Sequence, residues 1–187
     1  MTAEIELVAY SDDCRLRGRV TLDDDRLTDM LNAQAEFVVR DVLLESLEDG
    51  RTVELREMLL LRDELLLVEM AGPRGERTRR LSTRQHRMQV KVGPFVVAGY
   101  LHAPPTIDAY ASVRRRPPMV PLTAATISYS VAGLPQLRDC SAVILNREQA
   151  EWIMPTSDEA LYFPNVPTIV DPLGMAKDLS GSIFFPG

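Results

Sequence analysis

The sequence has little of what catalytic metal sites and disulfide scaffolds require. Of its 187 residues, two are cysteines (Cys14 and Cys140) and two are histidines (His86 and His102). Two cysteines cannot build a disulfide framework, so we expect a reduced, cytoplasmic chain. Structural zinc sites use Cys and His ligands at short spacings, and neither a CxxC nor an HxxxH pair occurs. We therefore expect no metal site and no catalytic cysteine or histidine.

Long apolar runs and phosphate-binding motifs are also missing. No stretch approaches the roughly 20 apolar residues of a transmembrane helix, and the start, MTAEIELVAYSDD, lacks the pattern of a signal peptide. No glycine-rich phosphate loop, nucleophile elbow or kinase motif is present. These absences predict a protein that inserts in no membrane, carries no cofactor and is not an enzyme.

Charge is present, but it is distributed unevenly. The formal net charge of −6 disfavours binding of nucleic acid by the whole surface. Residues 1–72 hold 8 Lys and Arg against 18 Asp and Glu, whereas residues 73–116 hold 10 against 2. A basic linker is expected at 73–87, and we consider two interpretations of it. It is either a solvated segment that faces the acidic first half, which we favour, or part of an anion-binding patch. The residues of that possible patch are Arg77, Arg79, Arg80, Arg84, Arg114, Arg115 and Arg116.

One pattern of elements occurs twice along the chain. Residues around Gly18 match those around Gly99, and the offset between matching positions stays between 81 and 84. Each unit begins with two runs of alternating apolar residues, which predict strands. The glycine inside the second run predicts a bulge or a close approach of another backbone.

A short helix is expected after the second strand of each unit. Asp25 is a plausible N-cap of the first helix, and Thr106 precedes the second. Apolar stripes with helical spacing are expected at Leu27, Met30 and Leu31, and again at Ile107, Tyr110 and Ala111.

Three further strands complete each unit. They are expected at 37–47, 53–61 and 65–70 in the first unit, and at 120–131, 137–145 and a short run that ends at 152–153 in the second. The leucines at 59–61 and 65–67 could form one buried helix, but the polar triplet at 62–64 favours a hairpin. The sequence therefore predicts a mainly β (α+β) protein: a tandem pair of small bent-sheet or β-barrel units. The units are expected at 1–72 and 88–154, each with about five strands and one short helix.

Motifs in both units resemble an uncharacterised bacterial family of small β-rich domains that often occur in tandem. The matching motifs are RGRV (17–20) and RLTDMLN (26–32) in the first unit, and GYLHAPP (99–105) and PMVPLT (118–123) in the second. The resemblance implies a fold type and no activity. A short helix among bent strands is also similar in topology to Sm-like small barrels.

Residues 155–187 differ from both units, because they combine five prolines with many apolar side chains. Such spacing of prolines disfavours a long helix or a central strand, and so many exposed apolar groups are expected to dock on a protein surface. We expect an extended arm that docks on a neighbour or on its own chain through Phe163, Ile169, Leu173, Phe184 and Phe185.

Two functions remain open from the sequence. The first is a non-enzymatic interaction or scaffold protein, whose partner is another protein or a copy of itself. The second is a nucleotide or RNA sensor that uses residues 74–91 together with Arg114, Arg115 and Arg116.

Overall fold

The computed structural model describes residues 3–22, 26–70 and 83–156. The prediction of a mainly β protein is confirmed, with two short helices among ten strands in these residues. The first half contains β1 (Ala3–Tyr10), β2 (Cys14–Leu22), α1 (Leu27–Ala33), β3 (Glu36–Ser46), β4 (Thr52–Leu61), the 3-10 turn η1 (Arg62–Glu64) and β5 (Leu67–Glu69). The second half contains β6 (Arg84–Val92), β7 (Phe95–Ala103), α2 (Ala109–Arg114), β8 (Met119–Val131), β9 (Leu134–Asn146) and β10 (Ala150–Pro155).

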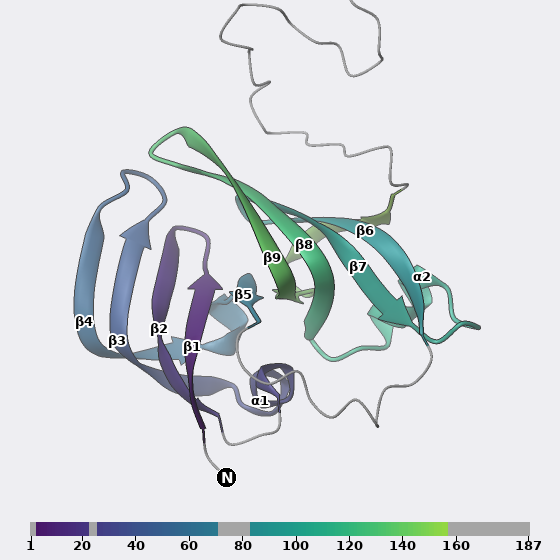
Figure 1. The fold of residues 1–187 in the computed structure, drawn as a ribbon, viewed down its shortest axis with the longest axis horizontal. Helices are drawn as coiled ribbons and strands as arrows, with labels where there is room; N and C mark the ends of the chain where they lie inside the picture. The colour runs from purple at the N-terminus through teal and green to yellow at the C-terminus, as the bar shows by residue number, and fades with distance from the viewer. Residues whose placement is uncertain (1–2, 23–25, 71–82, 157–187) are drawn as a thin grey trace, which may run out of the picture.

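All ten strands belong to one sheet, in the order β10-β6-β7-β8-β9-β5-β1-β2-β3-β4. Every recorded pair is antiparallel. The short β5 joins the two halves, because it pairs with β1 on one side and with β9 on the other. Figure 1 shows two strongly curved groups of strands that meet at β5, with β4 at one side of the molecule and β6 at the other.

The two halves have the same internal strand order, β5-β1-β2-β3-β4 and β10-β6-β7-β8-β9. Gly18 on β2 pairs with Leu7, and Gly99 on β7 pairs with Met88. These correspondences are what a duplicated unit would produce. Duplication itself, with separate units at 1–72 and 88–154, stays a prediction, because the strands form one continuous sheet.

The predicted bulges at the two strand glycines are confirmed. The register between β2 and β3 shifts between Arg17 and Arg19, and that between β7 and β8 shifts between Ala98 and Tyr100. A Cβ atom on Gly18 would lie 2.5 Å from Cγ1 of Val39, and one on Gly99 would lie 3.1 Å from Cβ of Leu122. The neighbouring strand therefore approaches each glycine closely, which a larger residue would prevent.

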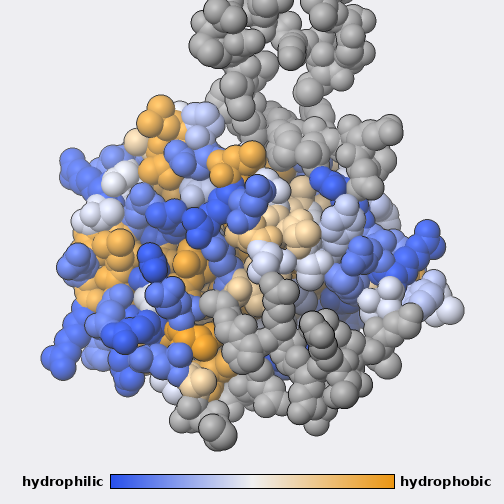
Figure 2. Space-filling view, in the orientation of Figure 1, coloured by the Kyte–Doolittle hydropathy of each residue, from blue (hydrophilic) through white to orange (hydrophobic). Residues whose placement is uncertain are grey.

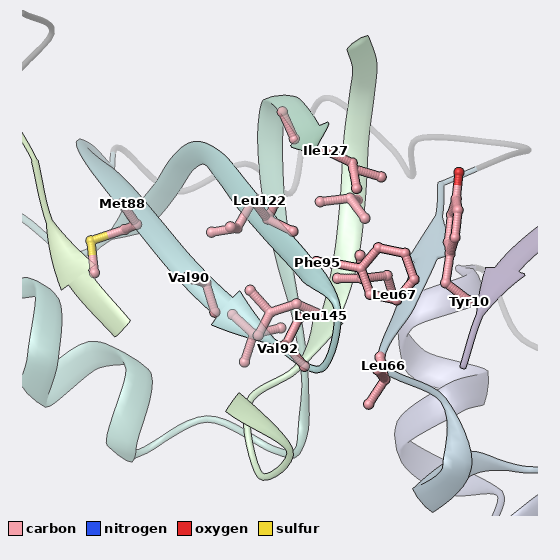
Figure 3. Close-up of a cluster of buried hydrophobic side chains, with 14 of the residues drawn as sticks. Tyr10, Leu66, Leu67, Met88, Val90, Val92, Phe95, Leu122, Ile127 and Leu145 are labelled. Atoms are coloured by element: carbon pink, nitrogen blue, oxygen red, sulfur yellow. The ribbon is translucent and has the colours of Figure 1, made fainter. Parts of the chain in front are cut away.

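The core consists of two clusters of buried side chains, and each cluster contains residues from both halves. One cluster adds Tyr10, Leu47, Leu66 and Leu67 to the second half, and the other adds Met119 and Ile144 to the first half. Figure 3 shows Phe95 and Leu67 next to each other in the first cluster, with Tyr10 on one side of them and Leu145 on the other. Because each cluster spans both halves, we expect the described residues to fold as one cooperative unit.

Helix α1 has the buried stripe that its sequence predicts, since Leu27, Met30 and Leu31 are buried. The side-chain amide of Asn32 donates to the backbone oxygen of Met119 at 3.0 Å and accepts from the nitrogen of Met119 at 3.0 Å. These two bonds fix α1 to the start of β8. The N-cap position of α1 is Arg26, whose side chain makes no capping hydrogen bond, and not Asp25 as predicted; Asp25 itself lies outside the described residues.

The predicted position of the second helix was wrong. The helix was expected directly after Thr106, but α2 begins at Ala109 and is capped by Asp108, whose carboxylate accepts from the nitrogen of Ala111 at 3.0 Å. Its buried residues are Ala109, Ser112 and Val113, while Tyr110 is exposed, so the apolar stripe is displaced from the predicted one.

The predicted hairpin between residues 53–61 and 65–70 does not form in the described structure. Strand β4 ends at Leu61, and after η1 the chain enters β5, which pairs with β1 and β9. The polar triplet at 62–64 does break the strand, but it directs the chain across to the other half of the sheet. Strand β4 is consequently left with a neighbour on one side only among the described residues.

Candidate interaction edge of the sheet

Strand β4 is the most exposed strand in the described part of the chain. Nine of its ten residues are less than fully buried, and Leu60 is the one in the core. Leu59 and Leu61 are 54% and 47% exposed, and Val53 is 53% exposed. Leu55 on β4 and Val38 on the neighbouring β3 are also exposed. Large apolar side chains on a free sheet edge are typical of a surface that pairs with another strand.

The edge of β4 opposite β3 has no neighbour among the described residues, and it also presents backbone groups. Near the turn, the nitrogen of Ser46 donates to the oxygen of Arg51, and at the other end the nitrogen of Arg62 donates to the oxygen of Ala35. In an antiparallel pair only alternate residues bond to the neighbour, so the remaining N–H and C=O groups of β4 point away from β3. Figure 2 shows hydrophobic patches among hydrophilic ones on the side of the molecule where β4 lies.

Charged residues occupy the middle of β4. Glu54, Arg56 and Glu57 lie between the two apolar ends of the strand, and all three are exposed. Charges at a sheet edge are a common protection against aggregation. The edge of β4 therefore combines exposed apolar ends with a charged middle.

The other end of the sheet is β10. It pairs with β6, from Ala150 opposite Val92 to Pro155 opposite Met88. Trp152, Ile153 and Met154 are half-buried. The predicted contact residues of the arm follow this strand. Phe163, Ile169, Leu173, Phe184 and Phe185 all lie outside the described residues.

The predicted anion patch is placed only in part. Arg77, Arg79 and Arg80 lie outside the described residues, whereas Arg84 begins β6 and is therefore part of a strand. Arg84 pairs with Ala103, and the Arg116 guanidinium donates to the backbone oxygen of the adjacent His102. Arg84 and Arg116 are thus brought to the same end of β7. Arg114 and Arg115 are exposed at the end of α2.

Tyr10, Glu69 and Arg138 form a polar cluster at the junction between the halves, which the sequence analysis did not predict. The Tyr10 hydroxyl donates to Glu69 Oε1 at 2.6 Å, and Arg138 Nη2 donates to Glu69 Oε2 at 2.9 Å. Burial and the bond to Glu69 raise the pKa of Tyr10, and the same carboxylate raises the pKa of Arg138. These groups come from β1, β5 and β9, so no local sequence pattern could have brought them together.

The pKa values of the two cysteines are both raised, chiefly by burial. Burial raises the pKa of Cys140 to about 11 and also raises the pKa of Cys14. A catalytic thiol needs the opposite shift, because the thiolate is the nucleophile. Within the described residues, no group of three or more His, Cys, Asp or Glu side chains is arranged to hold a metal ion. The same residues include no helix with the length and apolar character needed to span a membrane.

Comparison with known proteins gives no further guide. No family model matches the chain, and neither the curated proteins nor the solved structures contain a significant match. The resemblance to a family of small tandem β domains therefore stays a prediction.

Proposed function

We propose that this protein is a non-enzymatic interaction or assembly protein that binds a partner strand along β4. The observation that carries the proposal is the outer edge of β4, which pairs with no strand among the described residues and has Leu59, Leu61 and Val53 each about half exposed. Addition of a strand would give hydrogen-bond partners to the outward N–H and C=O groups, and would cover the leucines. Each large apolar side chain that is fully buried in this way contributes roughly 1.5–3 kcal/mol.

The proposal includes the C-terminal arm as a second contact region. The arm carries the aromatic and aliphatic residues Phe163, Ile169, Leu173, Phe184 and Phe185. Side chains of these types are common anchors in protein interfaces. An arm that docks beside a paired edge would raise the affinity of a short strand-to-strand contact by an increase in effective concentration.

Site-specific photocrosslinking in the cells that make the protein tests the proposal. Leu59 is replaced by a photoreactive phenylalanine analogue, and the control places the same analogue at Arg17, which is exposed on β2 with neighbours on both sides. We expect a protein adduct at position 59 and little at position 17. If position 59 forms no adduct, or both positions react equally, β4 is not an interaction edge.

A second function, the binding of an anion or of RNA, is favoured by one observation. Arg116 is half-buried, and this burial lowers the pKa of its guanidinium group. Within the described residues, the recorded ion pairs include none of Arg84, Arg114, Arg115 and Arg116. Uncompensated guanidinium groups on one end of a domain are suited to phosphate oxygens.

The salt dependence of binding distinguishes this function from strand pairing. Binding of a short single-stranded RNA should weaken steeply as salt rises, because phosphate contacts release counterions. The double substitution Arg114→Ala/Arg115→Ala should make the log–log slope shallower by about 1–2, while the melting temperature stays unchanged. Absence of RNA binding at low salt, or an equal slope in the variant, contradicts the anion site.

A further inference from the structure

The chain itself contains an example of how two edges of this fold join. At the junction of the halves, β5 pairs with β9, with Leu67 opposite Leu145, Val68 opposite Ile144 and Glu69 opposite Val143. The five aliphatic side chains of this joint are at most 2% exposed. Strand β9 therefore has its apolar residues covered at the point where β5 pairs with it.

The position of β9 in the second half corresponds to that of β4 in the first. Asp41 on β3 and Ala124 on β8 both have positive φ, 49° and 46°, at the bulge of the respective strand. Two residues before them, Val39 pairs with Met58 of β4 and Leu122 pairs with Val143 of β9. The correspondence therefore matches Met58 with Val143, Leu59 with Ile144 and Leu60 with Leu145.

The position of β10 corresponds to that of β5 in the same way. Leu67 of β5 pairs with Tyr10, three residues beyond Leu7, which is the partner of Gly18. Trp152 of β10 pairs with Lys91, three residues beyond Met88, the partner of Gly99. The correspondence therefore matches Trp152 with Leu67, Ile153 with Val68 and Met154 with Glu69.

We propose that β4 of one copy pairs with β10 of a second copy, in the register of the internal joint between β9 and β5. This inference rests on the proposed function, because it names the partner of the same β4 edge. The register places Met154 opposite Met58, Ile153 opposite Leu59 and Trp152 opposite Leu60 of the other copy. All six side chains are apolar, and the joint covers Leu59, which is 54% exposed in the single chain.

A joint between β4 of one copy and β10 of another uses one end of the sheet in each copy. The opposite end of each sheet stays available for a further copy. Strands β4 and β10 are the two ends of the sheet order, and in Figure 1 β4 and β6, the partner of β10, lie on opposite sides of the molecule. Pairing is head to tail, so each added copy still offers one free β4 and one free β10. The assembly closes into a ring if the rotation per copy permits, and otherwise grows as a filament.

The joint between copies is shorter than its internal template. In the template, the nitrogen of Met70 donates to the oxygen of Ala142 at 3.0 Å, next to the last pair. Pro155 occupies the corresponding position after Met154 and has no N–H to donate. The contact is therefore weak for a single pair of chains, and assembly depends on protein concentration.

The hydrogen bonds of the template also identify the best pair for a covalent test. Asn146 donates to the oxygen of Leu66, and Met70 donates to that of Ala142, so Glu69 and Val143 form a pair without mutual hydrogen bonds. Such pairs bring Cα atoms to about 4.5 Å, which a disulfide can span. The equivalent residues at the joint between copies are Met154 and Met58.

The experiment uses full-length chains with Cys14→Ser and Cys140→Ser, to which either Met58→Cys or Met154→Cys is added. After oxidation, we expect a disulfide-linked pair of chains only when the two variants are mixed. A chain that carries both substitutions should give a ladder of linked oligomers or one closed ring. The off-register control, Thr52→Cys mixed with Met154→Cys, should remain unlinked, and melting curves verify that each variant is folded.

Two outcomes overturn the inference. One is a mixture that gives no linked pair, and the other is a single variant that links to itself as efficiently, since that shows pairing of identical edges. If photoadducts form at position 59 with a different protein while the cysteine mixture stays unlinked, β4 remains an interaction edge and only the self-assembly fails. If a variant fails to fold, sedimentation of the unsubstituted chain tests the inference instead, because it measures whether copies of the chain associate.

Discussion

Replacing Phe95 with Ala should lower the free energy of unfolding by about 3–5 kcal/mol, as is typical for a fully buried phenylalanine. Phe95 has no exposed surface and lies at the start of β7. Its ring centroid is 5.3 Å from that of Tyr10 on β1 and 5.5 Å from that of Tyr129 on β8. The substitution thus removes packing between the two halves, in addition to packing within one of them.

Urea unfolding followed by circular dichroism measures this effect at a protein concentration where no assembly occurs. The control is Leu137→Ala on β9, where the side chain is 70% exposed and the expected change is within about 0.5 kcal/mol. A loss below about 1 kcal/mol for Phe95→Ala would mean that the aromatic cluster does not hold the halves together.

Leu67→Ala is the second substitution with a large expected effect, a loss of about 2–5 kcal/mol. Leu67 is fully buried in β5, between Tyr10 of β1 and Leu145 of β9. The cavity that it leaves lies in the one strand that connects the halves. We expect the variant to keep a single unfolding transition, because both core clusters contain residues from each half.

The matched control for Leu67→Ala is Leu59→Ala in dilute protein. Leu59 lies on the edge that corresponds to the covered part of β9, but no strand of the described part of the chain covers it. Its truncation should cost far less than that of Leu67. Two separate transitions in the Leu67→Ala variant would show that the halves unfold independently, in disagreement with the shared core.

Local patterns in the sequence were sufficient to predict the strands and the first helix. Alternating apolar residues predict β1 and β2, and the glycines at 18 and 99 predict the bulges that the structure contains. Leu27, Met30 and Leu31 have the spacing of a buried helical stripe, and all three are buried. These features depend on periodicity and on the lack of a side chain, which are both properties of a few neighbouring residues.

Long-range pairing could not be predicted from the same patterns. The residues 65–70 are as apolar as an ordinary hairpin strand, so their pairing with β1 and β9 has no local signal. Helix α2 begins later than expected because the Asp108 carboxylate satisfies the nitrogen of Ala111. The exposure of β4 could not be predicted either, because leucines such as Leu59 and Leu61 are typical of a strand that is covered by its neighbours.

Sedimentation velocity of the full-length, unsubstituted protein over a wide concentration range tests most directly whether the two ends of the sheet are complementary. We expect species of two or more chains of 20.9 kDa to increase with concentration, and Leu59→Glu to abolish them by placing a charge in the joint. A protein that stays at 20.9 kDa at every concentration, or a Leu59→Glu variant that assembles like the unsubstituted chain, would contradict head-to-tail pairing of β4 with β10.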